Sequence, residues 1–390
     1  MDFEDSPEQA TFRADARAFL SAHWPLRAPG ERPAPYVDLD DAALVARIKE
    51  WQACKLENGW ACLEWPTEFG GRGVSAIEAV IFEDEEKRFA TPPVNLFLIG
   101  HGMLGPTIMA HGTAAQKEAY LRPMARGDTI WCQLFSEPSG GSDLAAVRTT
   151  ARRDGDDWII NGQKIWTSAA HIGDYAVCVT RSDPNSEKHR GLTCFIVDLK
   201  MPGVEVRPIR QMDGSSDFNE VFLDELRLPD SMRLGAEGQG WQVVLTCLMN
   251  ERAALSGGLW TAGIEELVKL ARRVDVDGHP AIEDSATIAR IAEMHVRMRG
   301  VERVVQRSVT ALARGLPVGP EASISKLVLG RTGQEIASFA LELLGQAGLA
   351  HDDEPDFVTA YLRSPALRLA GGTDEILRNT IAERVLGMPR

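Results

Sequence analysis

Ser136-Glu137-Pro138-Ser139-Gly140-Gly141-Ser142-Asp143 joins a helical first third of the chain to a strand-like region. Before it, apolar residues recur at helical spacing, and after it they gather in short runs separated by turn signals. Its small residues let a ligand approach the backbone, while serine hydroxyls and free N–H groups can bind a phosphate or the polar edge of a flat ring. By itself this is a weak signal, because most Ser/Gly-rich turns are only turns.

The region after this segment predicts a compact antiparallel β structure. Segments 147–153 and 157–161 flank Asp154-Gly155, and Asn161-Gly162 leads into 163–168. Such pairs are strong hairpin signals, because both central residues of the tight turn need positive φ. Further strand-like runs lie at 175–180, 192–199, 203–209 and 218–226.

The region before this segment predicts helices. Ser6-Pro7-Glu8-Gln9 has a serine cap, a proline at the first helical position and a glutamine three residues after the cap. Ser75 with Glu78, and Thr113 with Gln116, repeat this capping box. The segment 65–73 is expected to be a tight surface loop, since it lacks the Lys-Ser/Thr of a phosphate-binding loop.

Helical spacing returns near Gly240 and predicts helices over 241–273, 283–314, 320–345 and 373–387. Thr373 is expected to cap the last helix, with Ile376, Leu377, Thr380 and Ile381 on its inner side. The fold class is therefore α+β and mostly α. The expected domains are an N-terminal helical domain over 1–129, a middle β domain over 130–237 and a C-terminal four-helix bundle over 238–390.

Composition narrows the class of protein. The 390 residues are 44% hydrophobic and 25% charged, which is a globular composition. The net charge of -14 argues against a nucleic-acid binder, and no apolar run is long enough to span a membrane. The acidic start, Met1-Asp2-Phe3-Glu4-Asp5, is unlike a targeting peptide, so we expect a cytoplasmic protein. The six cysteines form no C-x-x-C pair, so we expect reduced thiols and no metal site.

Two further stretches carry possible chemistry. In Trp166-Thr167-Ser168, an indole can cover a flat cofactor while the hydroxyls bind its edge; the alternative is a core tryptophan. In Gly371-Gly372-Thr373-Asp374-Glu375-Ile376, a helix start after two glycines can hold an anion or a carbonyl group; the alternative is an ordinary capped helix.

The order and spacing of the three stretches resemble the acyl-coenzyme A dehydrogenase family. Its pattern reads T/S-E-P-x-A/G-G-S-D, then N-G-x-K-x-W-I/T-T/S, then G-T-x-E/Q-I-x-R. Phe69-Gly70-Gly71-Arg72-Gly73 and Ile381-Ala382-Glu383-Arg384-Val385-Leu386-Gly387 also match, so the resemblance covers the whole chain. It implies the three domains given above, with FAD held between the β domain and the bundle and a neighbouring subunit completing the site.

The resemblance also implies roles for individual residues. Ser136 and Ser168 would hydrogen-bond the flavin ring, and Trp166 would pack on it. Ser142 would also meet the coenzyme A chain. The other residues implied to bind FAD are Gln133, Leu134, Phe135, Gly141, Thr167, Thr373, Asp374 and Glu375, with Arg272, Glu342 and Gln346 in the half that relatives share between subunits.

The proton-abstracting base distinguishes two branches of the family. Most members carry a glutamate immediately before the Gly-Thr of the last motif, where this chain has Gly371. A branch resembling isovaleryl- and long-chain-type enzymes carries it on the first bundle helix, where this chain has Glu251. A carboxylate in a dry pocket has the raised pKa that suits this task. The alternative is a surface glutamate beside Arg252. Met249, Arg252 and Gly372 would then line the substrate channel.

The implied activity is FAD-dependent α,β-dehydrogenation of an acyl-CoA thioester to a 2-enoyl-CoA, with electron-transfer flavoprotein as the electron acceptor. A homo-oligomer, either a dimer or a tetramer, is implied, and a hetero-oligomer is compatible with the altered residues Glu342 and Gln346. The alternatives are a flavin oxidase or monooxygenase on the same fold, and a non-catalytic subunit of a hetero-oligomeric dehydrogenase. The small residues Ser256, Gly257 and Gly258 fit either a wide acyl pocket or close helix packing.

Overall fold

The computed structural model describes residues 5–28, 31, 37–93, 95–255, 263–313, 316, 319–345 and 357–389, with only the backbone of 252–255 and 312–313. Gln346 and the segment 256–258 lie outside the described residues. The chain divides into two compact units. The first contains Met1–Gln211 and Ser215–Glu251, and the second contains Met212–Gly214 and Arg252–Arg390.

The first unit begins with helices whose starts follow the predicted capping boxes. Ser6, Ser75 and Thr113 each accept a hydrogen bond from the backbone N–H three residues on, and each third residue returns the bond, which confirms all three boxes. A π-helical turn, Gly100–Leu104, precedes α4. The helices are α1 (Pro7–His23), α2 (Ala42–Glu57), α3 (Ala76–Glu86), α4 (Gly105–His111) and α5 (Ala114–Arg126).

The predicted loop over 65–73 is confirmed as a tight turn. Only a short 3-10 turn, Thr67–Phe69, interrupts it. Gly70 and Gly73 have φ of 97° and 65°, which a residue with a side chain rarely adopts.

An eight-stranded sheet follows, in the order β6-β7-β3-β2-β4-β5-β8 with β1 beside β4. Most neighbours are antiparallel, as predicted, but β1 and β2 each run parallel to β4. The first four strands are β1 (Trp131–Leu134), β2 (Thr150–Asp154), β3 (Asp157–Ser168) and β4 (Tyr175–Arg181). The others are β5 (Leu192–Asp198), β6 (Val204–Ile209), β7 (Phe218–Pro229) and β8 (Arg233–Leu234).

One of the two predicted hairpins is correct and the other is wrong. Asp154-Gly155 turns β2 into β3, with Gly155 at φ 66°. Asn161-Gly162 makes no turn, because β3 runs through it with a bulge against β7. Gly162 is needed there for close packing: a Cβ would lie 2.4 Å from Thr149 Oγ1. The positive φ falls instead on Glu225 of β7, whose N–H donates to the Asn161 side chain (2.8 Å).

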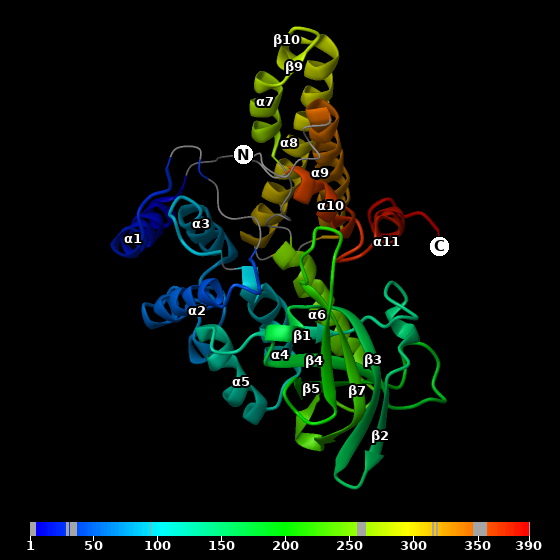
Figure 1. Cartoon of the computed structure of the whole chain (residues 1–390). Helices are drawn as coiled ribbons and strands as arrows, with labels where there is room; N and C mark the ends of the chain where they lie inside the picture. The colour runs from blue at the N-terminus through cyan, green and yellow to red at the C-terminus, as the bar shows by residue number, and fades with distance from the viewer. Residues whose placement is uncertain are drawn as a thin grey trace. The chain divides into compact units, whose positions relative to one another are not determined.

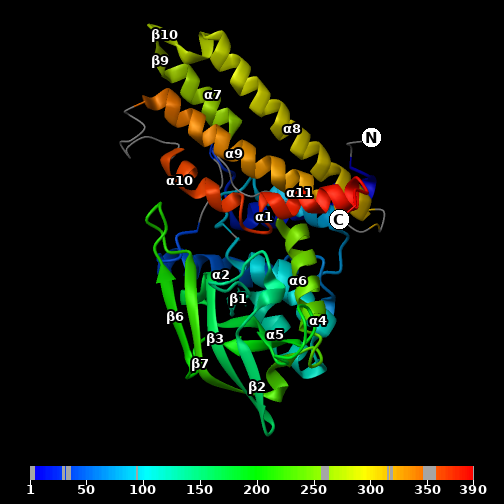
Figure 2. The same ribbon diagram turned by 90° about the vertical axis from the view of Figure 1, so that its right-hand side faces the viewer.

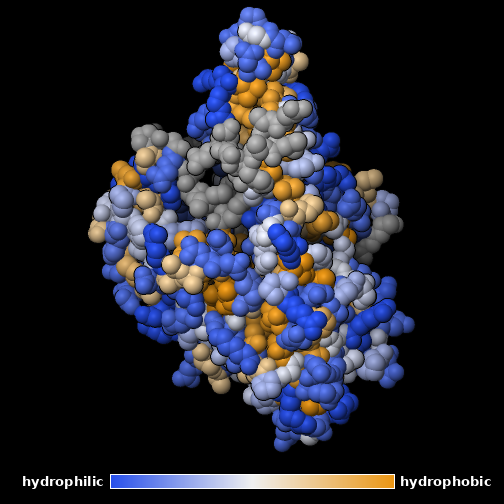
Figure 3. All heavy atoms as spheres, viewed as in Figure 1, coloured by the Kyte–Doolittle hydropathy of each residue, from blue (hydrophilic) through white to orange (hydrophobic). Residues whose placement is uncertain are grey.

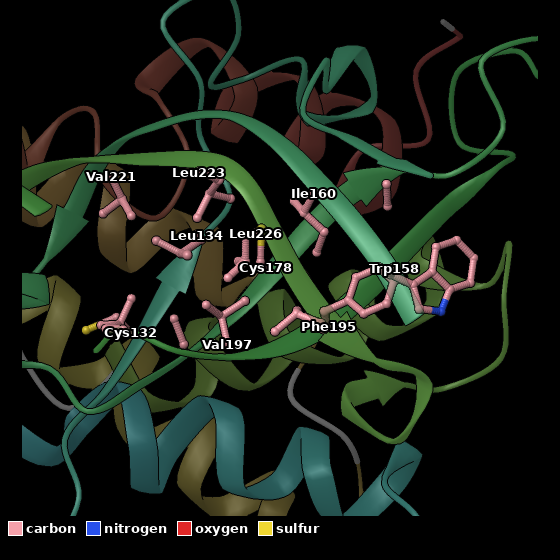
Figure 4. Close-up of a cluster of buried hydrophobic side chains, with 14 of the residues drawn as sticks. Cys132, Leu134, Trp158, Ile160, Cys178, Phe195, Val197, Val221, Leu223 and Leu226 are labelled. Carbon is pink, nitrogen blue, oxygen red and sulfur yellow. The ribbon is translucent and has the colours of Figure 1, made fainter. Parts of the chain in front are cut away.

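The sheet packs around an apolar cluster drawn mainly from six of its strands. Figure 4 shows side chains of neighbouring strands pointing toward a shared interior. The cluster comprises Cys132, Leu134, Ala151, Trp158, Ile160, Ala170, Ala176, Cys178, Phe195, Val197, Leu199, Val221, Leu223, Leu226 and Leu228.

The second unit is helical. Within it α8 and α9 pack along each other, α10 packs on α9, and α7 contacts both α8 and α9 (Figures 1 and 2). The helices of this unit are α7 (Ile264–Arg273), α8 (Ser285–Ala313), α9 (Ala322–Leu344), α10 (Phe357–Leu367) and α11 (Asp374–Thr380), with a short hairpin of β9 (Asp275–Val276) and β10 (His279–Pro280).

The order of helical, β and helical regions confirms the predicted fold class, with corrections in detail. The predicted helix over 241–273 is described as α6 (Gly240–Leu255) and α7. Helix α10 was not predicted, because Pro365 lies inside it and proline usually ends a helix. The caps of the last helix are as expected at Thr373, but only Leu377 of its predicted inner residues is buried. A π-helical turn, Ile381–Val385, follows α11.

The visible surface in Figure 3 is mostly hydrophilic, with apolar residues in smaller groups between charged ones. Such a surface agrees with the net charge of the chain. Among the described helices, none combines the length and the apolar character needed to cross a membrane.

Candidate functional site

The Ser136-to-Asp143 segment leaves the end of β1 and is held from behind by a buried ion pair. Lys164 of β3 has no exposed side-chain surface, and its Nζ donates to Glu137 Oε1 at 2.9 Å and to the Phe135 carbonyl at 3.2 Å. The Ile165 N–H donates to the Ser136 carbonyl at 3.0 Å. Because Phe135, Ser136 and Glu137 are each bonded to β3, the position of the start of this segment along that strand is fixed.

The Glu137 carboxylate is fully hydrogen-bonded although it is buried. It accepts from the N–H groups of Arg148 (2.7 Å) and Thr149 (2.9 Å) and from the Thr149 hydroxyl (2.6 Å). Burial alone would raise the pKa of Glu137, but the Lys164 ammonium and the Thr149 hydrogen bonds outweigh it and hold this pKa below its usual range. Glu137 is therefore ionised at neutral pH and acts as an acceptor rather than as a proton carrier.

Trp166-Thr167-Ser168 is the strained part of β3. Trp166 has φ 60° and Ala169 has φ 57°, and the pairing with β7 shifts register between Lys164 and Thr167. Left-handed backbone at a bulky residue is costly and clusters at functional sites. Trp166 is 57% exposed near the end of the strand, so it is not the core tryptophan of the alternative interpretation.

Three hydroxyl groups in and near this stretch have no hydrogen-bond partner among the described residues. Ser136 and Ser168 are partly exposed, and neither Oγ hydrogen-bonds to another described residue. Thr167 is 1% exposed, and its Oγ1 lies buried without a hydrogen-bond partner among the described residues. Buried polar groups are nearly always paired, so this one stands out. Gly141 and Ser142 are exposed on the same segment.

Leu134 and Phe135, which were expected to line the site, have buried side chains. Leu134 belongs to the sheet core. The structure therefore leaves only the backbone of these two residues for a ligand, and the Phe135 carbonyl already accepts from Lys164.

Helix α6 is anchored beside β1 within the same unit. Gln133 Nε2 lies 3.0 Å from Cys247 Sγ, and Cys247 is fully buried on the helix face formed with Val243 and Val244. Burial raises the pKa of the Cys247 thiol to about 12, so it remains protonated. Glu251 follows one turn later on that face and is half-buried. Met249 lies on the exposed face.

His111, which contacts this helix, and His101, which contacts α5, each donate a hydrogen bond from Nε2. Thr246 donates its only hydroxyl proton to the Gln242 carbonyl, so it accepts from His111 Nε2 at 2.8 Å. His101 Nε2 must likewise donate to the Met124 carbonyl at 2.7 Å. Burial lowers the pKa of His101 to about 4, so it is neutral.

The glycine segment of the second unit is held through its backbone. Gly371 and Gly372 have φ of 65° and 99°, and Lys326 of α9 donates to the Gly372 carbonyl. Asp374, expected to contact FAD, is turned inward, where Arg368 donates to its carboxylate at 2.8 Å. Glu375 is mostly exposed.

The residues expected at a subunit boundary lie on the surface of the second unit. Arg272 is exposed near the end of α7. Glu342 on α9 accepts from Arg290 of α8 at 2.6 Å. Of Arg252 the structure describes only the backbone, in α6.

These residues fit a large planar cofactor such as FAD. The fit rests on an exposed indole in strained backbone and on hydroxyls that no other described group satisfies. Sequence reasoning did not assign Glu137, Lys164 or Cys247 to the site. Glu137 and Lys164 lie inside the quoted motifs, but the sequence does not show that either charge is buried. Within the described residues, no cluster of His, Cys, Asp or Glu could hold a metal ion.

Comparison with known protein families accounts for most of the chain. The N-terminal domain of acyl-CoA dehydrogenases matches residues 6–128, the middle domain matches 132–226 and the C-terminal domain matches 238–386.

Individual relatives agree with these matches. The chain is 37% identical over 348 residues to acyl-CoA dehydrogenase IpdE1 of Mycobacterium tuberculosis, covering 88% of each chain. It resembles a chain of the ChsE4-ChsE5 complex from the same organism, with a TM-score of 0.79 and 30% identity over the full length of both. It also resembles a chain of the Tcur3481-Tcur3483 steroid ACAD, with a TM-score of 0.80 and 26% identity over the full length of both.

Proposed function

The chain belongs to the acyl-CoA dehydrogenase family, and we propose that it oxidises an acyl-CoA thioester to the 2-enoyl-CoA with Glu251 as the base. The family is FAD-dependent. The observation that carries the base assignment is the contrast between Gly371, which has no side chain, and Glu251, which continues the buried face of α6.

The proposed base suits its task by its place on α6. Removal of a proton next to a thioester carbonyl needs a carboxylate held at a fixed position and shielded from water. Val243, Val244 and Cys247 bury the preceding turns of the helix, and Gln133 joins Cys247 to β1. Glu251 therefore projects from a rigid support that is tied to the strand leading into Ser136.

The other candidate residues of the first unit are proposed to bind and orient the cofactor and the substrate. FAD, when bound, supplies the acceptor for the hydride that leaves the β-carbon. Ser136 and Ser168 offer hydroxyls to its ring, Trp166 offers an aromatic face, and Ser142 offers a hydroxyl to the coenzyme A chain. Thr373 and Glu375 are proposed to contact the adenine-nucleotide half.

An anaerobic titration of the purified flavoprotein tests the activity. We expect at least one thioester in a panel of linear, branched and ring-bearing acyl-CoA compounds to bleach the oxidised flavin band, with formation of the enoyl product. Purified protein that holds no flavin, or flavin that no thioester bleaches, would contradict the proposal. Rapid reoxidation by air with peroxide formation would favour an oxidase on the same fold.

The acyl group is proposed to be bulky and ring-bearing. The support is the resemblance to a steroid ACAD. In the same titration, a ring-bearing thioester should bleach the flavin at lower concentration than a linear one. The opposite order would contradict this part of the proposal.

The electron acceptor is proposed to be an electron-transfer flavoprotein, and the protein is proposed to act as a homo-oligomer. Arg272 and Glu342 would reach a neighbouring subunit's cofactor, as the family resemblance implies. Light scattering together with the flavin content tests the assembly, since a homo-oligomer should hold one FAD per chain. A lower ratio that is restored by a related second chain would indicate a hetero-oligomer, as in the ChsE4-ChsE5 complex.

A further inference from the structure

The buried ion pair of Glu137 and Lys164 links the two segments that carry the candidate flavin contacts. Lys164 lies two residues before Trp166 on β3, and Glu137 directly follows Ser136. Their charged atoms are 2.9 Å apart, and both side chains are almost fully buried. Buried pairs seldom add stability over apolar residues of the same volume, so this pair calls for another explanation.

The hydrogen bonds around the pair point to a positioning role. Lys164 Nζ also donates to the Phe135 carbonyl, and the Glu137 N–H and carbonyl bond the carbonyl and N–H of Gly140 at 2.9 Å each. The Lys164 ammonium group therefore fixes the backbone of Phe135, which precedes Ser136, and the side chain of Glu137, which follows it. The same lysine sits on the strand whose next residues form the strained turn of Trp166.

A second buried pair in the first unit provides a contrast. Lys55 of α2 and Glu86 of α3 lie 3.2 Å apart, and Trp51 Nε1 donates to Glu86 at 2.8 Å. This pair joins two helices and contacts neither candidate segment. It has the same charged groups as the Glu137–Lys164 pair but lies outside the candidate flavin-binding segments.

We propose that Glu137 and Lys164 are positioning residues that set the spacing between Ser136 and Trp166–Ser168 and so determine how tightly the flavin ring is bound. This inference rests on the proposed function, because it presumes that these segments bind FAD. It assigns no role in proton transfer to either residue. The pair acts through the segments that it holds, and the flavin is the group whose binding reports on it.

Three variants distinguish a positioning role of the pair from the effect of leaving one buried charge unpaired. E137Q leaves the Lys164 charge buried and unpaired, K164M leaves the Glu137 charge, and E137Q/K164M removes both charges. We expect thermal stability to fall in both single variants and to recover in the double variant. FAD affinity, measured from the flavin fluorescence that appears on dilution of the holoprotein, should stay weaker by about tenfold or more in the double variant. The reason is that the Phe135 carbonyl still lacks its donor.

The matched control is K55M/E86Q, which removes the other buried pair. We expect its FAD affinity to match that of the unaltered protein, whatever its thermal stability. The bound-flavin absorption band should shift in E137Q/K164M and not in this control, since band shape reports the ring's surroundings rather than the stability of the fold.

The outcomes distinguish the inference from the function on which it rests. If FAD affinity recovers together with stability in E137Q/K164M, the pair serves the fold only and the inference is wrong. If the control loses affinity equally, the effect is general and the inference is again wrong. An unaltered protein that binds no flavin would overturn the proposed function and the inference together.

Discussion

The two candidate segments of the chain, Trp166–Ser168 in the first unit and Gly371–Thr373 in the second, are built in different ways. The first offers side chains: an exposed indole and hydroxyls that bond no other residue in the described part of the chain, on a backbone fixed by a buried ion pair. The second offers mainly backbone, with two glycines at positive φ and a carbonyl held by Lys326. The second segment therefore has a defined backbone conformation although Gly371 and Gly372 carry no side chain.

The difference bears on where the base can lie. Gly371 has no side chain, so the second segment contributes no carboxylate at that position. Asp374 in the same segment is engaged by Arg368. If this contrast between the two segments holds, removal of a candidate side chain in the first unit changes chemistry or cofactor binding, whereas a methyl group added at Gly371 alters stability alone.

The largest expected effect comes from Glu251→Gln. The amide keeps the shape of the side chain but cannot take a proton, so turnover should fall by about 10²–10⁴-fold. FAD should remain bound, because Glu251 is not among the groups proposed to hold it. Turnover from steady-state kinetics, with flavin content from absorbance, measures both quantities.

Glu237→Gln is the control for this variant. Glu237 lies just before α6 and makes an exposed contact of 3.6 Å with Arg153, so the loss of its charge should leave turnover unchanged. If the Glu251→Gln protein is as active as this control, Glu251 is not the base. The proposed contrast between the two segments would then be wrong.

Much of the fold could be predicted because the local sequence signals favoured the same elements that the tertiary structure contains. The capping boxes at Ser6, Ser75 and Thr113 use only bonds within four residues, so sequence suffices for them. Asn161-Gly162 misled because its glycine is required by the neighbouring Thr149 rather than by a turn. Close packing between segments that are distant in the sequence leaves no local sequence pattern. An Asn-Gly pair in a β-bulge therefore looks the same in the sequence as one in a tight turn.

The candidate site shows the same limit. The motifs indicated which segments matter, but not which atoms face outward. Leu134 and Phe135 were predicted to line the site, yet their side chains pack inward. Glu137 and Lys164 are charged residues that a sequence places on the surface by default, and only the fold shows them buried against each other.

A smaller effect is expected from Ser168→Ala. The hydroxyl bonds no other described residue, so its removal should leave stability unchanged within about 0.5 kcal/mol. If it bonds the flavin, FAD affinity should fall by roughly two- to tenfold, the worth of one hydrogen bond. Thermal unfolding and flavin release on dilution give the two numbers.

Ser182→Ala is the matched control on the same sheet. Its hydroxyl donates to the Gly191 carbonyl at 3.1 Å and lies 2.7 Å from Thr193 Oγ1, so this variant should lose about 1 kcal/mol of stability. Its FAD affinity should not change. Equal affinities in the two variants would show that the Ser168 hydroxyl does not meet the cofactor.

The smallest effect is expected at the second segment, from Gly371→Ala. A Cβ at φ 65° costs about 1 kcal/mol, because left-handed backbone crowds the following carbonyl. Gly278, in the β9–β10 turn at φ 85° with open space around it, provides a matched site in the same unit. We expect Gly371→Ala and Gly278→Ala to lose similar stability in thermal unfolding and to keep the turnover of the unaltered protein. A selective loss of turnover at Gly371 would mean that its backbone takes part in the chemistry, and the division between a side-chain segment and a backbone segment would then fail.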